Sequence, residues 1–182
     1  MRNIMVYGFR LFIVTVVAGL LLGIANYITR DAIAARALEN EHAAYEQALL
    51  AQEYTQILLE AETFAKVVSA QTQNELKGFV FCSVVSGYGG EMWVYTGISV
   101  DGTVTGVFIG SNAETAGLGS NATKSSFRNQ FIGANQSVRI TKTGDGVHAL
   151  TGATITSNAV VGAVNTAIEY YSNNSATLMG GY

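Results

Sequence analysis

The strongest hydrophobic pattern in the chain is an unbroken apolar run at residues 11–29, LFIVTVVAGLLLGIANYIT, which has no charged side chain. As a helix, this run would be roughly 28 Å long, close to the thickness of the hydrocarbon core of a bilayer. The run is longer than the apolar centre of a signal peptide, and Asn26, Tyr27 and Ile28 make a poor cleavage site. We therefore expect a retained transmembrane helix at about 11–29, within a membrane anchor at 1–30.

The segment after the apolar run is rich in Ala, Leu, Glu and Gln, and its apolar residues recur at helical spacing up to about Ala61. This pattern predicts one or two helices with one buried face. We expect them to form a helical connector at 31–65 that leads out of the membrane.

Positive charges on the two sides of the apolar run indicate its orientation only through a small imbalance. Arg2 and Arg10 precede the run, whereas Arg30 and Arg36 follow it among acidic residues. We expect a single-pass protein of the cytoplasmic membrane, with the N-terminus in the cytoplasm and the soluble domain on the periplasmic, extracytoplasmic side.

Beyond the connector, the pattern changes to β-branched and aromatic runs separated by Gly-rich breaks. Four runs predict strands, at 76–87, 91–100, 103–111 and 137–143. Asp101 and Gly102 separate the second run from the third, with the length and composition of a type I′ hairpin turn. We therefore expect these two strands to be antiparallel.

The last periodic segment begins after Thr156 and predicts a helix that packs on the sheet. Its apolar residues fall on one helical face: Val160, Ala163, Val164, Ala167, Ile168 and Tyr171. The small and polar residues at 173–182 predict a flexible, frayed tail. Together these elements predict an α+β fold, with a folded domain at 66–172 behind one membrane helix.

Charge and cysteine content exclude several classes of function. After Arg30 the chain has 7 basic and 13 acidic residues, a net charge of 7 − 13 = −6, so no basic surface is available for nucleic acid. Cys82 is the only cysteine, which excludes an internal disulfide, and we expect it in the core. His42 and His148 are too few and too scattered for a zinc site, and we expect no bound metal.

Four hydroxyl residues cluster before the last helix: Thr151, Thr154, Thr156 and Ser157. Free N–H groups and the helix dipole attract phosphate at such a place, and Gly152 and Ala153 leave room for it. One alternative is that Thr156 or Ser157 is only the N-cap of the helix. The sequence has neither the Gly-Lys-Ser/Thr of a P-loop nor the GxSxG of a hydrolase, so a hydrolase with His148 as base has little support.

Longer stretches in the chain resemble those of a known family. GYGGEMWVYTGISVDGTVTGVFIG, AETAGLGS, SSFRNQFIG and TGATITSNAVVGAVNTAI follow one another at 87–110, 113–120, 125–133 and 151–168. In this order they resemble the FMN-binding domain proteins. The similarity is greatest to the G-type subunit of the Rnf ion-translocating electron-transport complex, a relative of the C-type subunit of the Na⁺-translocating NADH:quinone reductase.

The resemblance implies a cofactor and its attachment site. FMN would be joined by a phosphoester to the hydroxyl of Thr154, and a separate flavin transferase would make the bond. Thr154 would then be an acceptor, and no catalytic residue is expected. The remaining cofactor-binding residues implied are Thr151, Gly152, Ala153, Thr156 and Ser157 around the acceptor, and Glu114, Thr115, Gly117, Leu118 and Gly119 beside the flavin ring.

The resemblance also implies a role in a larger assembly, an ion-translocating ferredoxin:NAD oxidoreductase. The chain would transfer electrons within this membrane redox-driven ion pump, beside other membrane, iron–sulfur and flavin subunits, without independent catalysis. Two residues depart from the family pattern: Ala116 replaces a usual Pro, and His148 stands where the transferase recognition pattern commonly has Asp. An alternative is therefore a membrane-tethered structural or assembly subunit that carries no flavin.

Overall fold

The structure is a computed structural model that describes residues 2–57, 63–141 and 146–180. It divides into two compact units, residues 1–42 and residues 43–182. The first unit is the greater part of one long helix, α1, Arg2–Ala48. Between Tyr7 and Ala48 this helix is long and apolar enough to cross a membrane, with a mean hydropathy of 2.3 in its most apolar window. Side chains in this window are exposed, as a lipid-facing helix requires.

The region expected as a helical connector is only partly helical. Helix α1 ends at Ala48, and strand β1, Glu53–Ile57, follows it, so the prediction of helix up to about Ala61 is wrong for 53–57. Residues 58–61 lie outside the described residues. Strand β1 contains Glu and Gln, but its other residues, Tyr54, Thr55 and Ile57, favour strands, and it pairs with strand β2, Lys66–Thr72.

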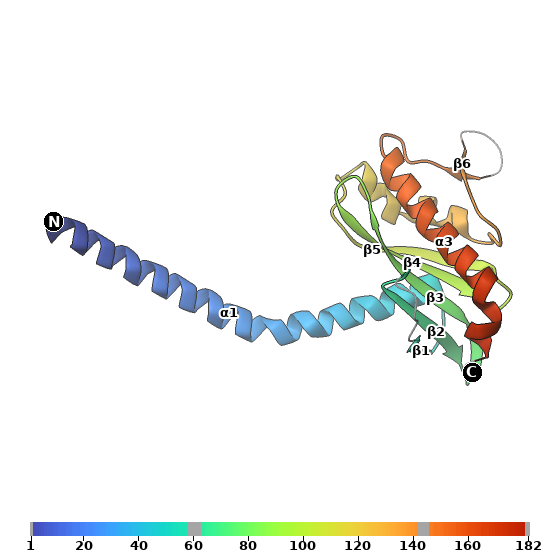
Figure 1. The fold of residues 1–182 in the computed structure, drawn as a ribbon, viewed down its shortest axis with the longest axis horizontal. Coiled ribbons are helices and arrows are strands. Elements are labelled where there is room, and N and C mark those ends of the chain that lie inside the picture. The colour runs from blue at the N-terminus through green and yellow to red at the C-terminus, as the bar shows by residue number, and fades with distance from the viewer. Residues whose placement is uncertain (1, 58–62, 142–145, 181–182) are drawn as a thin grey trace. The chain divides into compact units, whose positions relative to one another are not determined.

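The second unit is built on a five-stranded antiparallel sheet in the order β1-β2-β3-β4-β5 (Figure 1). Three of the expected strands are confirmed as β3, Glu75–Ser86, β4, Glu91–Ser99, and β5, Val104–Asn112. The antiparallel sheet and its covering helices confirm the expected α+β class.

The expected type I′ turn is not at Asp101 and Gly102. Gly102 has a φ of +84°, but Asp101 has no positive φ, and a type I′ turn needs a positive φ at both central residues. The N–H of Gly102 donates to the carbonyl of Ser99. The two-residue turn with positive φ at both positions lies instead between β2 and β3, at Gln73 (53°) and Asn74 (63°).

Helix α3, Thr154–Met179, covers one face of the sheet (Figure 1). All six residues of its expected apolar face are buried: Val160, Ala163, Val164, Ala167, Ile168 and Tyr171. The helix begins three residues earlier than expected and continues through Asn173 to Met179, because Leu178 is buried against the core. The expected fraying at 173–182 is therefore wrong up to residue 179.

The opposite face of the sheet is covered by the last turns of α1, which belong to the second unit. Ala44, Tyr45, Ala48 and Leu49 pack there with Cys82. Cys82 is 0% exposed, which confirms the expected core position.

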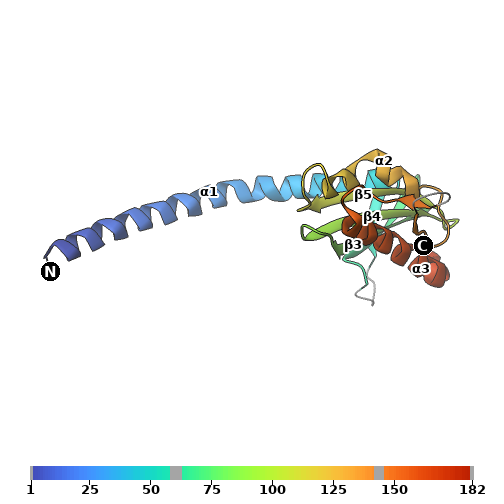
Figure 2. The same cartoon turned by 90° about the horizontal axis from the view of Figure 1, so that it is seen from above.

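Short elements join β5 to α3: η1 (Gly119–Thr123), α2 (Ser125–Arg128), η2 (Asn129–Phe131), β6 (Ile140–Thr141) and β7 (Val147–His148). Figure 2 shows α2 beside β5. Phe127 and Phe131 are buried and anchor this segment to the core shared with α3. The strand expected at 137–143 is reduced to the two residues of β6, paired in parallel with β7, and residues 142–143 lie outside the described residues.

Candidate functional site

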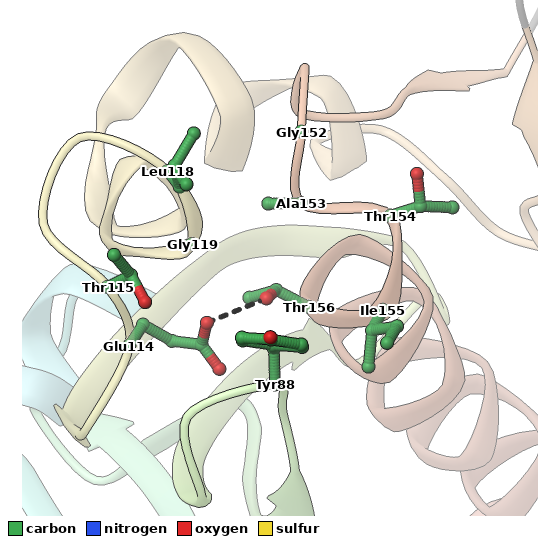
Figure 3. Close-up of a pocket in the computed structure, with 10 residues that line it drawn as sticks. All are labelled: Tyr88, Glu114, Thr115, Leu118, Gly119, Gly152, Ala153, Thr154, Ile155 and Thr156. Carbon is green, nitrogen blue, oxygen red and sulfur yellow. Dashed lines mark hydrogen bonds between the residues drawn. The ribbon is translucent and has the colours of Figure 1, made fainter.

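A cavity of about 440 Å³ opens beside the start of α3 (Figure 3). Three segments form it: the turn between β3 and β4, the loop after β5, and the loop that leads into α3. Its volume falls within the range of about 300–1,000 Å³ that is typical of small-molecule sites. The lining residues are Tyr88, Glu114, Thr115, Leu118, Gly119, Gly152, Ala153, Thr154, Ile155 and Thr156.

The first turn of α3 presents free hydrogen-bond donors. Ala153 is the N-cap and provides no side-chain cap, and the first turn contains no acidic residue. Within the described part of the chain, the N–H groups of residues 154–156 have no partner, and the first bonded N–H is that of Ser157, which donates to the carbonyl of Ala153. Free N–H groups and the positive end of the helix dipole make this end of the cavity suitable for an anion such as phosphate.

Two of the four clustered hydroxyls are buried and form hydrogen bonds within the protein. Ser157 is 0% exposed, accepts the N–H of Leu150 at 2.9 Å and donates to the carbonyl of Ala153 at 2.9 Å. Thr156 is also 0% exposed and donates to Oε2 of Glu114 at 2.8 Å. Both lie inside the helix, so the alternative that one of them is its N-cap is wrong.

The other two hydroxyls, those of Thr151 and Thr154, are exposed. Thr154 lines the cavity, and Figure 3 shows its hydroxyl turned away from Glu114 and Tyr88. Thr151 instead lines a second groove, of about 590 Å³, on the far side of Leu118. Of the four hydroxyl residues, Thr154 is therefore the one that is exposed and also lines the cavity.

Gly152 gives the loop before α3 its path. Its φ is +74°, a left-handed conformation that glycine adopts without a steric penalty. A Cβ atom at this position would lie 3.1 Å from Cδ2 of Leu118. Gly152 thus lets this loop and the loop after β5 approach each other closely.

Apolar side chains border the cavity and remain partly exposed. Leu118 is 45% exposed, Ile155 56% and Tyr88 72%. Tyr88 and Ile155 line the cavity but were not among the site residues expected from the sequence. The signal for Tyr88 was a single aromatic residue between glycines in a turn, where it has little chance of burial, whereas Ile155 differs little from any other apolar residue of a helix.

The structure brings together most of the expected site residues, but not all. Three of them do not line the cavity: Gly117 and Thr151 line the second groove, and Ser157 is buried behind the loop. The second groove also includes Lys124 and His148. His148, which departs from the pattern's Asp, therefore lies beside the loop that leads into α3 and adds no negative charge there.

Comparisons with known proteins place this site within a family. A profile described as the FMN-binding domain matches residues 87–169, which include the three segments of the cavity. The G-type subunit of the Na⁺-translocating ferredoxin:NAD⁺ oxidoreductase complex of Acetobacterium woodii is 33% identical over 190 residues, which cover 92% of this chain and 91% of that protein. The chain belongs to this family of G-type subunits.

A second member of the family, the G-type subunit of the proton-translocating complex of Clostridium ljungdahlii, is 32% identical over 164 residues, covering 84% of this chain and 83% of that protein. Among solved structures, NqrC of Shewanella oneidensis matches with a TM-score of 0.55 at 19% identity, over 75% of this chain and 74% of that one. At this identity the structural match shows a shared fold and nothing more specific.

The cavity of this G-type subunit suits the cofactor for which the FMN-binding domain is named. An FMN molecule has an anionic phosphate and a flat, largely apolar ring system. The free N–H groups of residues 154–156 are donors for a phosphate, and Leu118, Ile155 and Tyr88 supply apolar contact area. Glu114 is the one charged residue among the ten that line the cavity.

Proposed function

We propose that this G-type subunit transfers electrons through an FMN group that is joined by a phosphoester to Oγ1 of Thr154. The observation that carries the proposal is the exposed Thr154, which lines the cavity and lies next to the free N–H groups of the first turn of α3. The relatives' names place them in ion-translocating ferredoxin:NAD⁺ oxidoreductase complexes. The proposed role is that of a redox subunit in such a membrane-bound pump.

Residues of this chain would bind and orient the cofactor. A phosphodiester at Thr154 keeps one negative charge, which the first turn of α3 stabilises through its N–H groups and dipole. The apolar side chains at the cavity exclude water from one side of the ring system. FMN itself supplies the capacity to accept and release electrons. Thr154 would be only the acceptor. On a separate flavin transferase its hydroxyl would attack the flavin-side phosphate of an activated flavin dinucleotide, so that the pyrophosphate bond breaks, the nucleoside monophosphate leaves and the hydroxyl proton passes to a base of the transferase.

The remaining parts of the proposal concern the membrane and the partners. Helix α1 would hold the protein in the cytoplasmic membrane, with residues 43–182 on the extracytoplasmic side. Electrons would pass to and from other membrane, iron–sulfur or flavin subunits of the complex. A flavin-free structural subunit is the alternative, and its one argument is His148, which lines the second groove where the family pattern has an acid.

The test is to produce the full chain together with a flavin transferase and to examine the denatured protein. In-gel fluorescence and intact mass should show one FMN per chain, mapped to the peptide that contains Thr154. Thr154→Ala should abolish the label. Thr166→Ala is the matched control, because Thr166 is an exposed threonine further along α3, and it should keep the label. An unlabelled wild-type chain, beside a relative that the same transferase labels, would favour the structural subunit.

A further inference from the structure

Glu114 connects the three segments that form the cavity. Its Oε2 accepts the hydroxyl of the buried Thr156 at 2.8 Å, and its Oε1 accepts the N–H of Gly89 at 3.1 Å. One carboxylate therefore joins the start of α3, the turn between β3 and β4, and its own loop. Figure 3 shows the bond to Thr156 at the side of the cavity, below Leu118 and next to Tyr88.

Two glycines leave room for this carboxylate. A Cβ atom at Gly119 would lie 1.9 Å from Oε2 of Glu114, and one at Gly87 would lie 2.1 Å from Oε1. Both distances are far shorter than any van der Waals contact, so neither position tolerates a side chain while the carboxylate keeps its place. Gly119 and Gly87 lie in two different segments, so the backbone on both sides is shaped around the same group.

The negative charge of Glu114 has no ion-pair partner within the described part of the chain. Its two hydrogen bonds come from a neutral hydroxyl and a neutral amide. Glu114 is half-buried and lines the cavity, so solvent screens its charge less than that of a fully exposed carboxylate. The charge therefore acts on whatever occupies the cavity.

We propose that Glu114 is the positioning residue of the flavin cavity: its bond to Thr156 fixes the start of α3 for modification at Thr154, and its charge lowers the reduction potential of the bound flavin. This inference rests on the proposed function. A negative charge beside the ring opposes the addition of an electron, because reduction adds negative charge to the same region. The two parts of the proposal are separated by the choice of variants.

The positioning role is tested with Thr156→Val, which keeps the shape of the side chain and removes the hydroxyl, and with Thr156→Ser, which keeps the hydroxyl. With the transferase present, we expect Thr156→Val to reduce the labelled fraction severalfold and Thr156→Ser to restore it. In protein made without the transferase, the effects of Glu114→Ala and Thr156→Val on thermal unfolding should be non-additive. Wild-type labelling of Thr156→Val, or additive effects on unfolding, would overturn the positioning role.

The charge is tested with Glu114→Gln, whose amide can still accept from Gly89 and donate to Thr156. We expect the labelled fraction of this variant to show a higher midpoint potential than the labelled wild type. A tenfold change in the equilibrium constant for one-electron reduction, about 59 mV, is the expected size. Glu169→Gln is the matched control, because Glu169 is exposed on α3, away from the cavity, and its potential should equal that of the wild type.

The two possible failures are distinguishable. An unlabelled wild-type chain would contradict the proposed function, while the unfolding experiment on unlabelled protein would still test the bond between Glu114 and Thr156. A labelled Glu114→Gln protein with an unchanged potential would overturn the role of the charge and leave the proposed function intact.

Discussion

At the residue scale, Gly152 and Gly162 are predicted to respond in opposite directions to the same substitution. Gly152→Ala places a side chain at a φ of +74° and close to Leu118, so we expect it to destabilise the protein by about 1–2 kcal/mol. Gly162 is exposed within α3 and has no atom near its Cβ position, so Gly162→Ala should stabilise by about 0.5–1 kcal/mol. Urea unfolding of the full chain in detergent measures both. Equal effects of the two variants would contradict the assigned conformation of Gly152.

Ser157 provides a second prediction at this scale. Ser157→Ala removes the acceptor of the Leu150 N–H and leaves that donor without its partner, so we expect a loss of about 1–3 kcal/mol in the free energy of unfolding. Ser172→Ala, on the exposed side of α3, should change it by less than about 0.5 kcal/mol. If Ser157→Ala were as stable as the wild type, the Ser157 hydroxyl would not hold the loop before α3 in place.

At the scale of elements, Tyr171 fastens α3 to the turn between β4 and β5. Its hydroxyl donates to the carbonyl of Val100 at 2.7 Å. Tyr171→Phe removes this bond and should cost about 0.5–1.5 kcal/mol. Tyr170→Phe is the control: within the described part of the chain the Tyr170 hydroxyl has no bonding partner, and its ring contacts with Phe64 and Phe81 survive in Phe. Thermal unfolding should show a lower melting temperature for Tyr171→Phe and an unchanged one for Tyr170→Phe.

The same bond predicts a dependence on pH. Burial raises the pKa of Tyr171, and the charge of Asp101 raises it further. The pKa of Tyr171 in the folded protein therefore lies above the unfolded value of about 10. The neutral phenol contributes fully to the free energy of unfolding below the unfolded pKa, and this contribution is lost as the pH rises through the folded pKa. The free energy of unfolding of the wild type should therefore exceed that of Tyr171→Phe at neutral pH and no longer exceed it in strongly alkaline solution. A constant difference up to high pH would contradict this.

Elements with a regular pattern were predictable from the sequence, and those set by tertiary pairing were not. The face of α3 that includes Val160 and Ile168 repeats at helical spacing, and β3 to β5 are long and bounded by turns. Strand β1 contains the strand-favouring Tyr54, Thr55 and Ile57, but it follows a segment with helical spacing, and its pairing with β2 lies outside that local pattern. In the site, Thr154 was identified through a motif, whereas the bond between Glu114 and Thr156 joins residues 42 positions apart, which no local pattern reveals.

At the scale of the whole molecule, the chain combines a helix suited to a membrane with a domain that carries the cavity. The helix has exposed apolar side chains over its most apolar window, and the domain has its own core on both faces of the sheet. The covalent cofactor that we propose would suit such a protein, because it would keep the electron carrier on the subunit while electrons pass to its neighbours.

The side of the membrane on which the domain lies can be tested with the cysteine content of the chain. Cys82 is the only cysteine and is 0% exposed, so the folded wild type should not react with a membrane-impermeant maleimide. Ser172→Cys places a thiol on the exposed face of α3, and Gly8→Cys places one before the expected span. If the domain is extracytoplasmic, intact spheroplasts should label Ser172→Cys, and Gly8→Cys should react only after permeabilisation. The reverse pattern would place the cavity in the cytoplasm, where its electron-transfer partners would have to be sought instead.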